Sequence, residues 1–440
     1  IGAGHVAGGI FSAKAGRLRL ERFGLESHSY ESWREDRWRT AVASSLGALA
    51  ARLKFRGPCT IVPPGHLILT KFARTPSVAA VRRERSIAFE ASEHIPLPLE
   101  KVAWGHQIIG DDGLSLEIVL LAARVDVMQS LCDAVEIAGF RSEHVTAGSL
   151  ALYEAFRYNY PGTHNSVIVA NVGAKTTHLL FVAGDRFHIR TIDFGGDAVT
   201  RAVAEELQID FLPAEALKIR LLGGDSDLAL HSPSRTAVRR STAAFGARLQ
   251  FEIRRTAAHW CRQAGVPAAV DLYLTGGGSL IPGLADEIAE RFALRVIRFD
   301  PLHQVDIGEQ SRAALGNESE CPPAELVGAA ARLLLKSDAK MDLLPPAMKR
   351  AVAARKRRAP QLAAAMLVGL AFLPPIHYYQ WQTAAAGAEL VEVARRLEPI
   401  RMMEAQNEDR LRQIDEGKKR VIALTAAYEA RGGWISFLAE

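Results

Sequence analysis

Short runs of apolar residues, separated by polar turns and by longer amphipathic stretches, fill the first three quarters of the chain. A strand repeats its buried positions every second residue and a helix every three to four, so these runs can be assigned. We expect strands at residues 2–11, 18–25, 59–62 and 66–72, and a helix at residues 33–53. Arg74-Thr75-Pro76 ends this group. The next segment, 77–145, predicts a helix, strands at 102–109 and 114–122, and a helix at 126–138.

Three turns rich in glycine adjoin predicted strands. An apolar strand at 271–275 runs into Gly276, Gly277 and Gly278, and a helix is expected at once. A buried strand ending near residue 172 leads into a turn of small and hydroxyl residues at 173–177, and residues 1–4 form a third turn before a pair of strands. Glycine lets the backbone press against a ligand, and the N–H groups that begin a helix favour an anion. One such segment fits a nucleotide pocket and a plain tight turn equally well, but three favour the pocket.

These segments resemble the actin-like ATPase superfamily and, within it, the family of the type IV pilus assembly protein PilM. The resemblance covers roughly residues 1–338. It is strongest at 187–200, where a strand meets Gly195-Gly196 and a helix starts, and at 87–100, an "FEA…IP-P-E" run similar to the extra subdomain that PilM shares in form with the division protein FtsA. The resemblance implies an α/β fold of the actin-like (ribonuclease H-like) type, with two lobes and an inserted FtsA-type subdomain.

In that superfamily two phosphate loops and an adenosine loop surround ATP. The resemblance therefore implies ATP as the cofactor of this chain, and places its nucleotide-binding residues at Gly2, Ala3, Gly4, Gly173, Ala174, Lys175, Thr176, Thr177, Gly195, Gly196, Glu215, Lys218, Gly276, Gly277 and Gly278. Glu215 and Lys218 resemble the Glu-x-x-Lys element that meets the ribose. For Lys175, a solvated surface position is the alternative.

The chemistry of this chain departs from its relatives at the cation site. The acidic residue that holds hydrated Mg²⁺ in the second phosphate loop is Asn171 here, a degenerate Mg²⁺ position, because an amide lacks the negative charge that a hard cation prefers. The acid of the first loop would precede Ile1. No catalytic residue is assigned. We therefore expect nucleotide binding with at most weak ATP hydrolysis, which makes the chain a binding protein or scaffold.

Composition and charge narrow the possibilities. The chain has 440 residues, a length that predicts about three folding units. The net charge of +5 is small and dispersed, and no aromatic and basic interleaving is present, so nucleic acid is not expected as a partner. The four cysteines are isolated, without metal-ligand spacing, so neither disulfides nor a zinc site is expected. A reducing cytosol is the natural location for this part of the chain.

A short apolar motif follows the globular region. Asp342, Leu343, Leu344 and Pro345 resemble the N-terminal "INLLP" motif of PilN, the inner-membrane partner of PilM, with Asp342 in place of the usual Asn. The resemblance implies a protein-binding segment that lies extended in a groove of the first lobe, with the leucines in apolar pockets and proline fixing the backbone. An ordinary proline-terminated linker is the alternative.

The last hundred residues have a different character. Basic residues at 349–358 precede an apolar stretch at 362–376 that ends in Tyr378, Tyr379 and Trp381, which predicts one transmembrane helix with the preceding domain in the cytoplasm. A buried core helix or a membrane-surface anchor is the alternative. Pro374-Pro375 would kink this helix. From residue 393 to 428 apolar side chains and Asn407 recur every seven residues, which predicts a coiled coil, or alternatively a single solvated helix.

The predicted organisation is a PilM–PilN-like fusion. Its segments are the first lobe at 1–76, the inserted subdomain at 77–145, the rest of both lobes at 146–338, the motif and basic linker at 339–360, the transmembrane helix at 361–381 and a periplasmic stalk at 382–440. Such a single-pass inner-membrane scaffold would link the cytoplasmic pilus motor to the envelope complex. Its expected partners are PilO-like, platform and motor proteins and membrane lipid, in a homo- or hetero-oligomer. The alternatives are a type II secretion platform protein, an actin-fold kinase and an FtsA-like filament scaffold.

Overall fold

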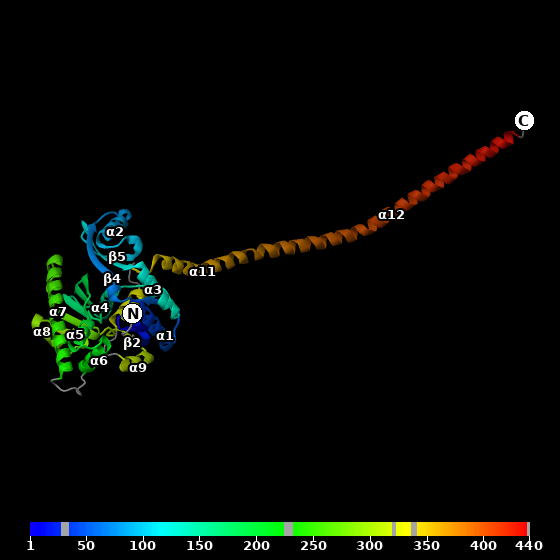
Figure 1. Cartoon of the computed structure of the whole chain (residues 1–440). Coiled ribbons are helices and arrows are strands. Elements are labelled where there is room, and N and C mark those ends of the chain that lie inside the picture. The colour runs from blue at the N-terminus through cyan, green and yellow to red at the C-terminus, as the bar shows by residue number, and fades with distance from the viewer. Residues whose placement is uncertain (28–34, 224–231, 319–322, 336–340, 438–440) are drawn as a thin grey trace. The chain divides into compact units, whose positions relative to one another are not determined.

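The structure is a computed structural model that describes residues 1–27, 35–223, 232–318, 323–335 and 341–437. The chain divides into two compact units, Ile1–Val352 and Ala353–Glu440 (Figure 1). All strands of the described residues lie in the first unit. The expected boundary at residues 338 and 339 falls outside the described residues.

A small sheet and a group of helices form the first lobe. Strands β1 and β2 make an antiparallel hairpin, and the short β13 adds to β2 in parallel. The parallel pair β3 and β7 lies in the same lobe. The bounds are β1 (His5–Lys14), β2 (Arg17–Ser27), α1 (Glu35–Leu53), β3 (Pro58–Ile61), α3 (Val125–Ile137), β7 (Arg141–Val145), α4 (Gly148–Asn159), β13 (Asp306–Ile307), α9 (Glu309–Glu318) and α10 (Ala324–Leu334).

A three-stranded antiparallel sheet with one helix on its face lies beside this lobe. Its strand order is β4-β6-β5. Its elements are β4 (Ile68–Pro76), α2 (Ala80–His94), β5 (Val102–Asp111) and β6 (Ser115–Arg124), with single turns of 3₁₀ helix at η2 (Gly65–Leu67) and η3 (Leu99–Lys101). Strand β4, assigned from the sequence to the first lobe, is an edge strand of this sheet. Conversely, α3 and β7 of the expected insertion supply Met128, Leu131 and Val145 to the core of the first lobe.

The alternation of β6 explains how this sheet is held. Val119 and Leu121 face the core of the first lobe. Ile118 and Leu120 point to the opposite face and pack with Ile87 of α2. Because successive side chains of a strand point to opposite faces, β6 is buried on both sides.

The second lobe is a five-stranded sheet of order β10-β9-β8-β11-β12, flanked by helices. Val167 and Val169 of β8 join the first core, whereas Ile168 and Ala170 join a second core under the helices of this lobe. The bounds are β8 (Val167–Val172), β9 (Thr177–Ala183), β10 (Arg186–Ile192), α5 (Asp197–Leu207), α6 (Phe211–Leu222), α7 (Pro233–Ala264), β11 (Asp271–Thr275), η4 (Gly277–Leu280), α8 (Leu284–Phe292) and β12 (Arg295–Arg298).

One element after the third glycine turn differs from the expectation. The helix predicted directly after Gly278 is the 3₁₀ helix η4, and the α-helix α8 starts only at Leu284. Pro282 and Gly283 lie between them, and Gly283 has a φ of 79°, which an α-helix cannot continue through. A short 3₁₀ helix, and not an α-helix, therefore follows the glycine turn.

The described residues of the second unit are helical apart from a break at Phe372. Its elements are α11 (Pro346–Ala371), which begins in the first unit, and α12 (Leu373–Phe437). The break falls at Phe372, so Pro374 and Pro375 occupy the first turn of α12, where a missing N–H costs nothing. The helical region contains one stretch long and apolar enough to cross a membrane, and its side chains are exposed. Pro399 lies inside α12 without ending it.

Candidate functional site

The second and third glycine turns leave the central sheet at the same edge. Strands β8 and β11 are parallel neighbours, and Thr275 lies opposite Asn171 in their register. The carboxyl ends of parallel strands meet at one edge, where α/β proteins bind ligands. The turn that follows β8 and the turn that follows β11 therefore stand side by side.

Glycine is required where these two turns touch. Gly276 has a φ of 83°, and a Cβ atom there would lie 2.4 Å from the carbonyl oxygen of Val172 and 2.5 Å from Oδ1 of Asn171. A Cβ on Gly278 would likewise collide with the side chain of Val172. Gly277, between them, would meet nothing within 4 Å. Two glycines thus serve backbone packing, and the third faces open space that a ligand can enter.

The helix start at Gly195-Gly196 is fastened to the second turn. The N–H of Gly196 donates to the carbonyl oxygen of Gly173 at 2.9 Å, and the N–H of Asp197 donates to that of Ala174 at 2.8 Å. A Cβ on Gly195 would lie 2.5 Å from both carbonyl oxygens. These two N–H groups are therefore already bonded within the protein, and the glycines fix the shape of the turn.

Glu215 and Lys218 form a buried ion pair behind that helix start. Lys218 Nζ lies 2.6 Å from a carboxylate oxygen of Glu215 and donates to Thr200 Oγ1 at 2.8 Å and to the carbonyl oxygen of Gly196 at 3.3 Å. Thr200 also hydrogen-bonds to Glu215. The Glu-x-x-Lys element thus ties α6 to the first turn of α5, and its contact with a ribose stays a prediction.

Asn171 reaches across to the first lobe. Its Nδ2 donates to Oε1 of Glu325 in α10 at 2.5 Å. A Cβ on Gly148, at the start of α4, would lie 3.5 Å from Cγ of Glu325. Burial raises the pKa of Glu325, while the hydrogen bond from Asn171 acts in the opposite direction. Helix α10 also contacts β1, the strand that follows the first turn. All three turns therefore lie near the Asn171–Glu325 hydrogen bond.

Asp197 and His66 are two further polar residues of this region that the sequence analysis did not single out. Asp197 is 2% exposed, and its Oδ1 has no hydrogen-bond partner among the described residues. Burial raises its pKa, against the charges of Lys218 and Lys175. Burial, followed by the charge of Lys175, lowers the pKa of His66 to about 4. Only Asp197 could have been found from the sequence, because it directly follows the paired glycines. Glu325 and His66 lie in stretches of sequence that carry no recognisable motif.

A second site lies at the end of β7, where residues 341–345 pack against the first lobe. Asp342 Oδ1 accepts from the N–H of Val145 and from the N–H of Leu344, both at 2.9 Å, and Oδ2 lies 3.1 Å from Nδ1 of His144. The N–H of Leu343 donates to the carbonyl oxygen of Val145 at 2.9 Å. One backbone hydrogen bond and the Asp342 carboxylate thus attach the segment to the end of β7.

Apolar burial completes this attachment. Met341, Leu343 and Leu344 are 4%, 0% and 1% exposed and belong to the core of the first lobe. Lys349 Nζ also donates to the carbonyl oxygen of Asp342 at 2.5 Å. Burial alone would raise the pKa of Asp342, but the hydrogen bonds from His144, Val145 and Leu344 and the charge of Lys349 lower it. Asp342 is therefore held as a carboxylate.

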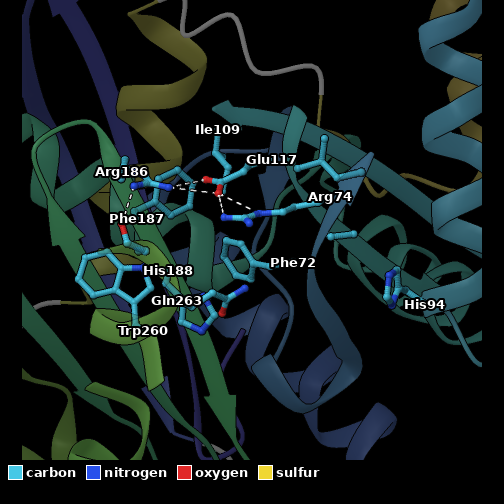
Figure 2. A pocket seen from close by; sticks show the side chains of 13 residues that line it. Phe72, Arg74, His94, Ile109, Glu117, Arg186, Phe187, His188, Trp260 and Gln263 are labelled. Carbon is cyan, nitrogen blue, oxygen red and sulfur yellow. Dashed lines mark hydrogen bonds and ion pairs between the residues drawn. The ribbon is translucent and has the colours of Figure 1, made fainter. Parts of the chain in front are cut away.

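A cavity of about 230 Å³ lies where the three-stranded sheet meets the second lobe (Figure 2). At its rim Glu117 of β6 bonds Arg74 of β4 and also Arg186 of β10, whose Nη2 lies 3.1 Å from both carboxylate oxygens. Phe72 and His188 contact each other across the same junction, with ring centroids 4.4 Å apart and ring planes inclined by 36°. The ion pairs of the Glu117 carboxylate with Arg74 and Arg186, called the clasp below, thus connect the three-stranded sheet to the second lobe.

Two lobes, each built on its own sheet, with glycine turns meeting between them, define the actin-like ATPase fold. The family model of the type IV pilus assembly protein PilM matches residues 10–321, more than half of the chain. The chain therefore belongs to the PilM family, which confirms the resemblance seen in the sequence.

A solved structure shares this fold. A chain titled "PilM-PilN type IV pilus biogenesis complex" is similar at a TM-score of 0.63 and 20% identity, over 76% of this chain and 96% of that chain. The ethanolamine utilization protein EutJ from Carboxydothermus hydrogenoformans gives a TM-score of 0.37 at 13% identity, over 74% of this chain and 86% of its own. Component A of (R)-2-hydroxyglutaryl-CoA dehydratase from Acidaminococcus fermentans gives 0.34 at 11%, over 76% and 96%. A comparison with curated proteins finds no match.

Proposed function

We propose that this chain is an inner-membrane platform of type IV pilus assembly that binds ATP and carries its own PilN-like segment. Membership of the PilM family supports the role in pilus assembly. The apolar stretch of the C-terminal helices is consistent with a single membrane anchor, with the first unit in the cytoplasm and α12 continuing as a periplasmic stalk. PilO-like, platform and motor proteins would be its partners.

The observation that carries the proposal is the attachment of residues 341–345 to β7. This segment is buried in the same compact unit as the glycine turns, and the membrane-anchor candidate begins within the helix that follows it. A conformational change in the glycine turns would therefore affect the segment that leads into the membrane-anchor helix. Few residues separate the two sites, because β7 ends at Val145 and α4 begins at Gly148, beside Glu325.

The open face of Gly277, together with the turns after β8 and before β1, supports ATP as the ligand. The backbone of these turns would hold the phosphates, and the region near Glu215 and Lys218 the ribose. At most weak ATP hydrolysis is expected, because Asn171 lacks the negative charge that a hard cation prefers. The proposed use of ATP is to set how firmly the two lobes close on each other.

Nucleotide binding is tested by calorimetry and thermal shift of the full chain in detergent, with ATP and with ATP plus Mg²⁺. A Cβ on Gly277 would meet nothing within 4 Å, so Gly277→Arg directs a long side chain into the open space, and we expect it to abolish binding while the protein remains folded. Gly162→Arg is the matched control, since Gly162 also has open space but lies in an exposed turn away from the site. No binding by the wild type, or equal binding by both variants, would remove ATP from the proposal.

The pilus role is tested by isolating the chain from native membranes and identifying co-purifying proteins by mass spectrometry. We expect pilus inner-membrane components. Their absence, with components of a type II secretion system in their place, would assign the platform to that system.

A further inference from the structure

Two sheet edges meet where the three-stranded sheet adjoins the second lobe. Strand β4 is an edge of the three-stranded sheet, and β10 is an edge of the five-stranded sheet. They touch at Phe72 and His188 (Figure 2). The cavity beside the clasp is lined by β4 from Phe72 onward and by β10 up to His188. A second cavity, of about 660 Å³, is lined by β4 up to Phe72 and by β10 from His188 onward.

This second cavity, called the edge groove below, runs along the edges of both strands. Its walls include the consecutive residues 68–72 of β4 and 188–191 of β10. Successive side chains of a strand point to opposite faces, so a cavity lined by all of them lies at the edge of the strand. Apart from the pairing of β4 with β6 and of β10 with β9, the backbone of these two stretches forms no hydrogen bond within the described part of the chain. The edge groove is therefore walled by unpaired N–H and C=O groups, which form a template for a further strand.

The edge groove and its rim carry basic side chains that the protein does not neutralise. Lys71 lines the groove and forms no ion pair with the residues that the structure describes. Helix α7 contributes His259 and Gln263 to the wall. Residues three and four positions apart share a helix face, so the exposed Arg255 and Arg262 lie beside His259. Neither arginine has an ion pair among the described residues.

The remaining charges of the edge groove nearly balance one another. Arg124 pairs with Asp126 at 2.5 Å and Arg190 pairs with Glu252 at 2.9 Å. Asp193 is the acidic residue among those that line the groove. The three unpaired basic residues outweigh it, so the groove and its rim attract negative charge.

Two histidines of the lining do not add to this charge at neutral pH. Burial lowers the pKa of His66 and the pKa of His188 to about 4, with nearby positive groups acting in the same direction. Both imidazoles are therefore neutral at pH 7. The positive charge of the groove rests on lysine and arginine.

We propose that the edge groove binds an acidic, extended segment of a partner protein. The segment pairs with the backbone edge of β4 and places its carboxylates near Lys71, Arg255 and Arg262. Backbone pairing supplies affinity in this mode of recognition, and the charges select acidic sequences. A segment bound there contacts both the three-stranded sheet and the second lobe, and so holds them together. None of the predicted nucleotide-binding residues lines the groove, so this inference does not depend on ATP.

The first experiment is photo-crosslinking of the full chain in the cells that produce it. The photoreactive residue p-benzoylphenylalanine replaces Gln263, which is exposed and lines the edge groove, and the crosslinked peptide is sequenced by mass spectrometry. We expect it to capture one acidic segment of a partner protein. Ala244 is the control position, since it is exposed on the same helix but lies about 28 Å away at 1.5 Å per residue, and it should not capture this segment.

The second experiment measures binding of a synthetic peptide of the captured sequence to the purified full chain in detergent, by fluorescence anisotropy. Lys71→Glu and Arg262→Glu should each weaken binding roughly fivefold, because each removes an attraction and adds a repulsion. Arg239→Glu is the matched control, an exposed position of α7 outside the groove, and should bind as the wild type does.

Strand pairing is tested with the same peptide, N-methylated either at its odd or at its even positions. Alternate N–H groups of a strand point toward one neighbour, so one of the two modified peptides should bind roughly tenfold more weakly or worse. Equal binding of both modified peptides and the unmodified one would exclude pairing with the edge.

Three other results would overturn the proposal. The first is no crosslink at Gln263 beyond that at Ala244, which would leave Lys71 as a charge that merely protects a strand edge. The second is a captured segment that is not acidic or that belongs to another copy of this chain. The third is equal binding by the wild type and by both charge-reversal variants in the groove.

Discussion

Asp342 makes the attachment of residues 341–345 testable, because one carboxylate holds the backbone on both sides of the contact with β7. It accepts two backbone N–H groups at 2.9 Å and lies 3.1 Å from His144, with about a quarter of its side chain exposed. Asp342→Ala removes these bonds and leaves the N–H of Val145 without its partner. Charge-assisted hydrogen bonds contribute about 1.5 kcal/mol or more each, and partial exposure reduces the total, so we expect a loss of about 3 kcal/mol.

The assay is hydrogen exchange, followed by mass spectrometry, on the full chain in detergent. Amides of the segment exchange when it detaches from β7, so a loss of about 3 kcal/mol should raise their exchange rates roughly 100-fold. Strand β8 should be unaffected. Asp342→Asn keeps an acceptor oxygen and should raise the rates by roughly tenfold or less.

The matched control is Asp112→Ala. Asp112 also accepts two backbone N–H groups, those of Leu114 and Ser115, but in an exposed turn. This substitution should leave the exchange of residues 341–345 unchanged. Unaltered exchange of the segment in Asp342→Ala would show that the leucines alone hold it, and would refute the role given to the carboxylate.

Three further predictions concern the turns, the clasp and pH. Gly276→Ala should lower the free energy of unfolding by about 2–4 kcal/mol, because Gly276 has a positive φ and a Cβ there would collide with the carbonyl oxygen of Val172. Gly277→Ala should change it by less than about 1 kcal/mol, and equal effects of the two variants in thermal denaturation would contradict the described packing. Glu117→Gln should weaken the clasp to Arg186 by about 1 kcal/mol, seen as faster exchange in β10, and a double-mutant cycle with Arg186→Gln that gives no coupling would exclude the clasp. The pKa of Asp342 is lowered from its ordinary value of 3.8, so the stability that its carboxylate contributes is complete above pH 3.8 and is lost as the pH falls through the lowered pKa. The difference in free energy of unfolding between wild type and Asp342→Asn should therefore shrink below about pH 4. A difference that stays constant in acid would argue against a charged Asp342 as the source of this stability.

Local pattern was enough to predict most of the elements. The strands β5 and β6 and the helix α3 follow from period and turn residues, and the structure contains them close to the expected bounds. The sequence also identified the PilM family, because its motifs are local runs of residues. The start of α8 was placed too early, since the glycine turn after β11 is closed first by a 3₁₀ helix and Gly283 interrupts the backbone before Leu284.

The sequence by itself thus determined which segments are strands, helices and glycine turns, since these depend on residues close together in the chain. Only the tertiary structure decided that Asn171 bonds Glu325, 154 positions away, and that Asp342 caps the end of β7, 197 positions from Val145. It also decided that Gly195 and Gly276 serve close backbone contacts while Gly277 faces open space. The physical reason is that burial and charge pairing are set by neighbours in space, and no period along the chain encodes which distant residue those neighbours will be.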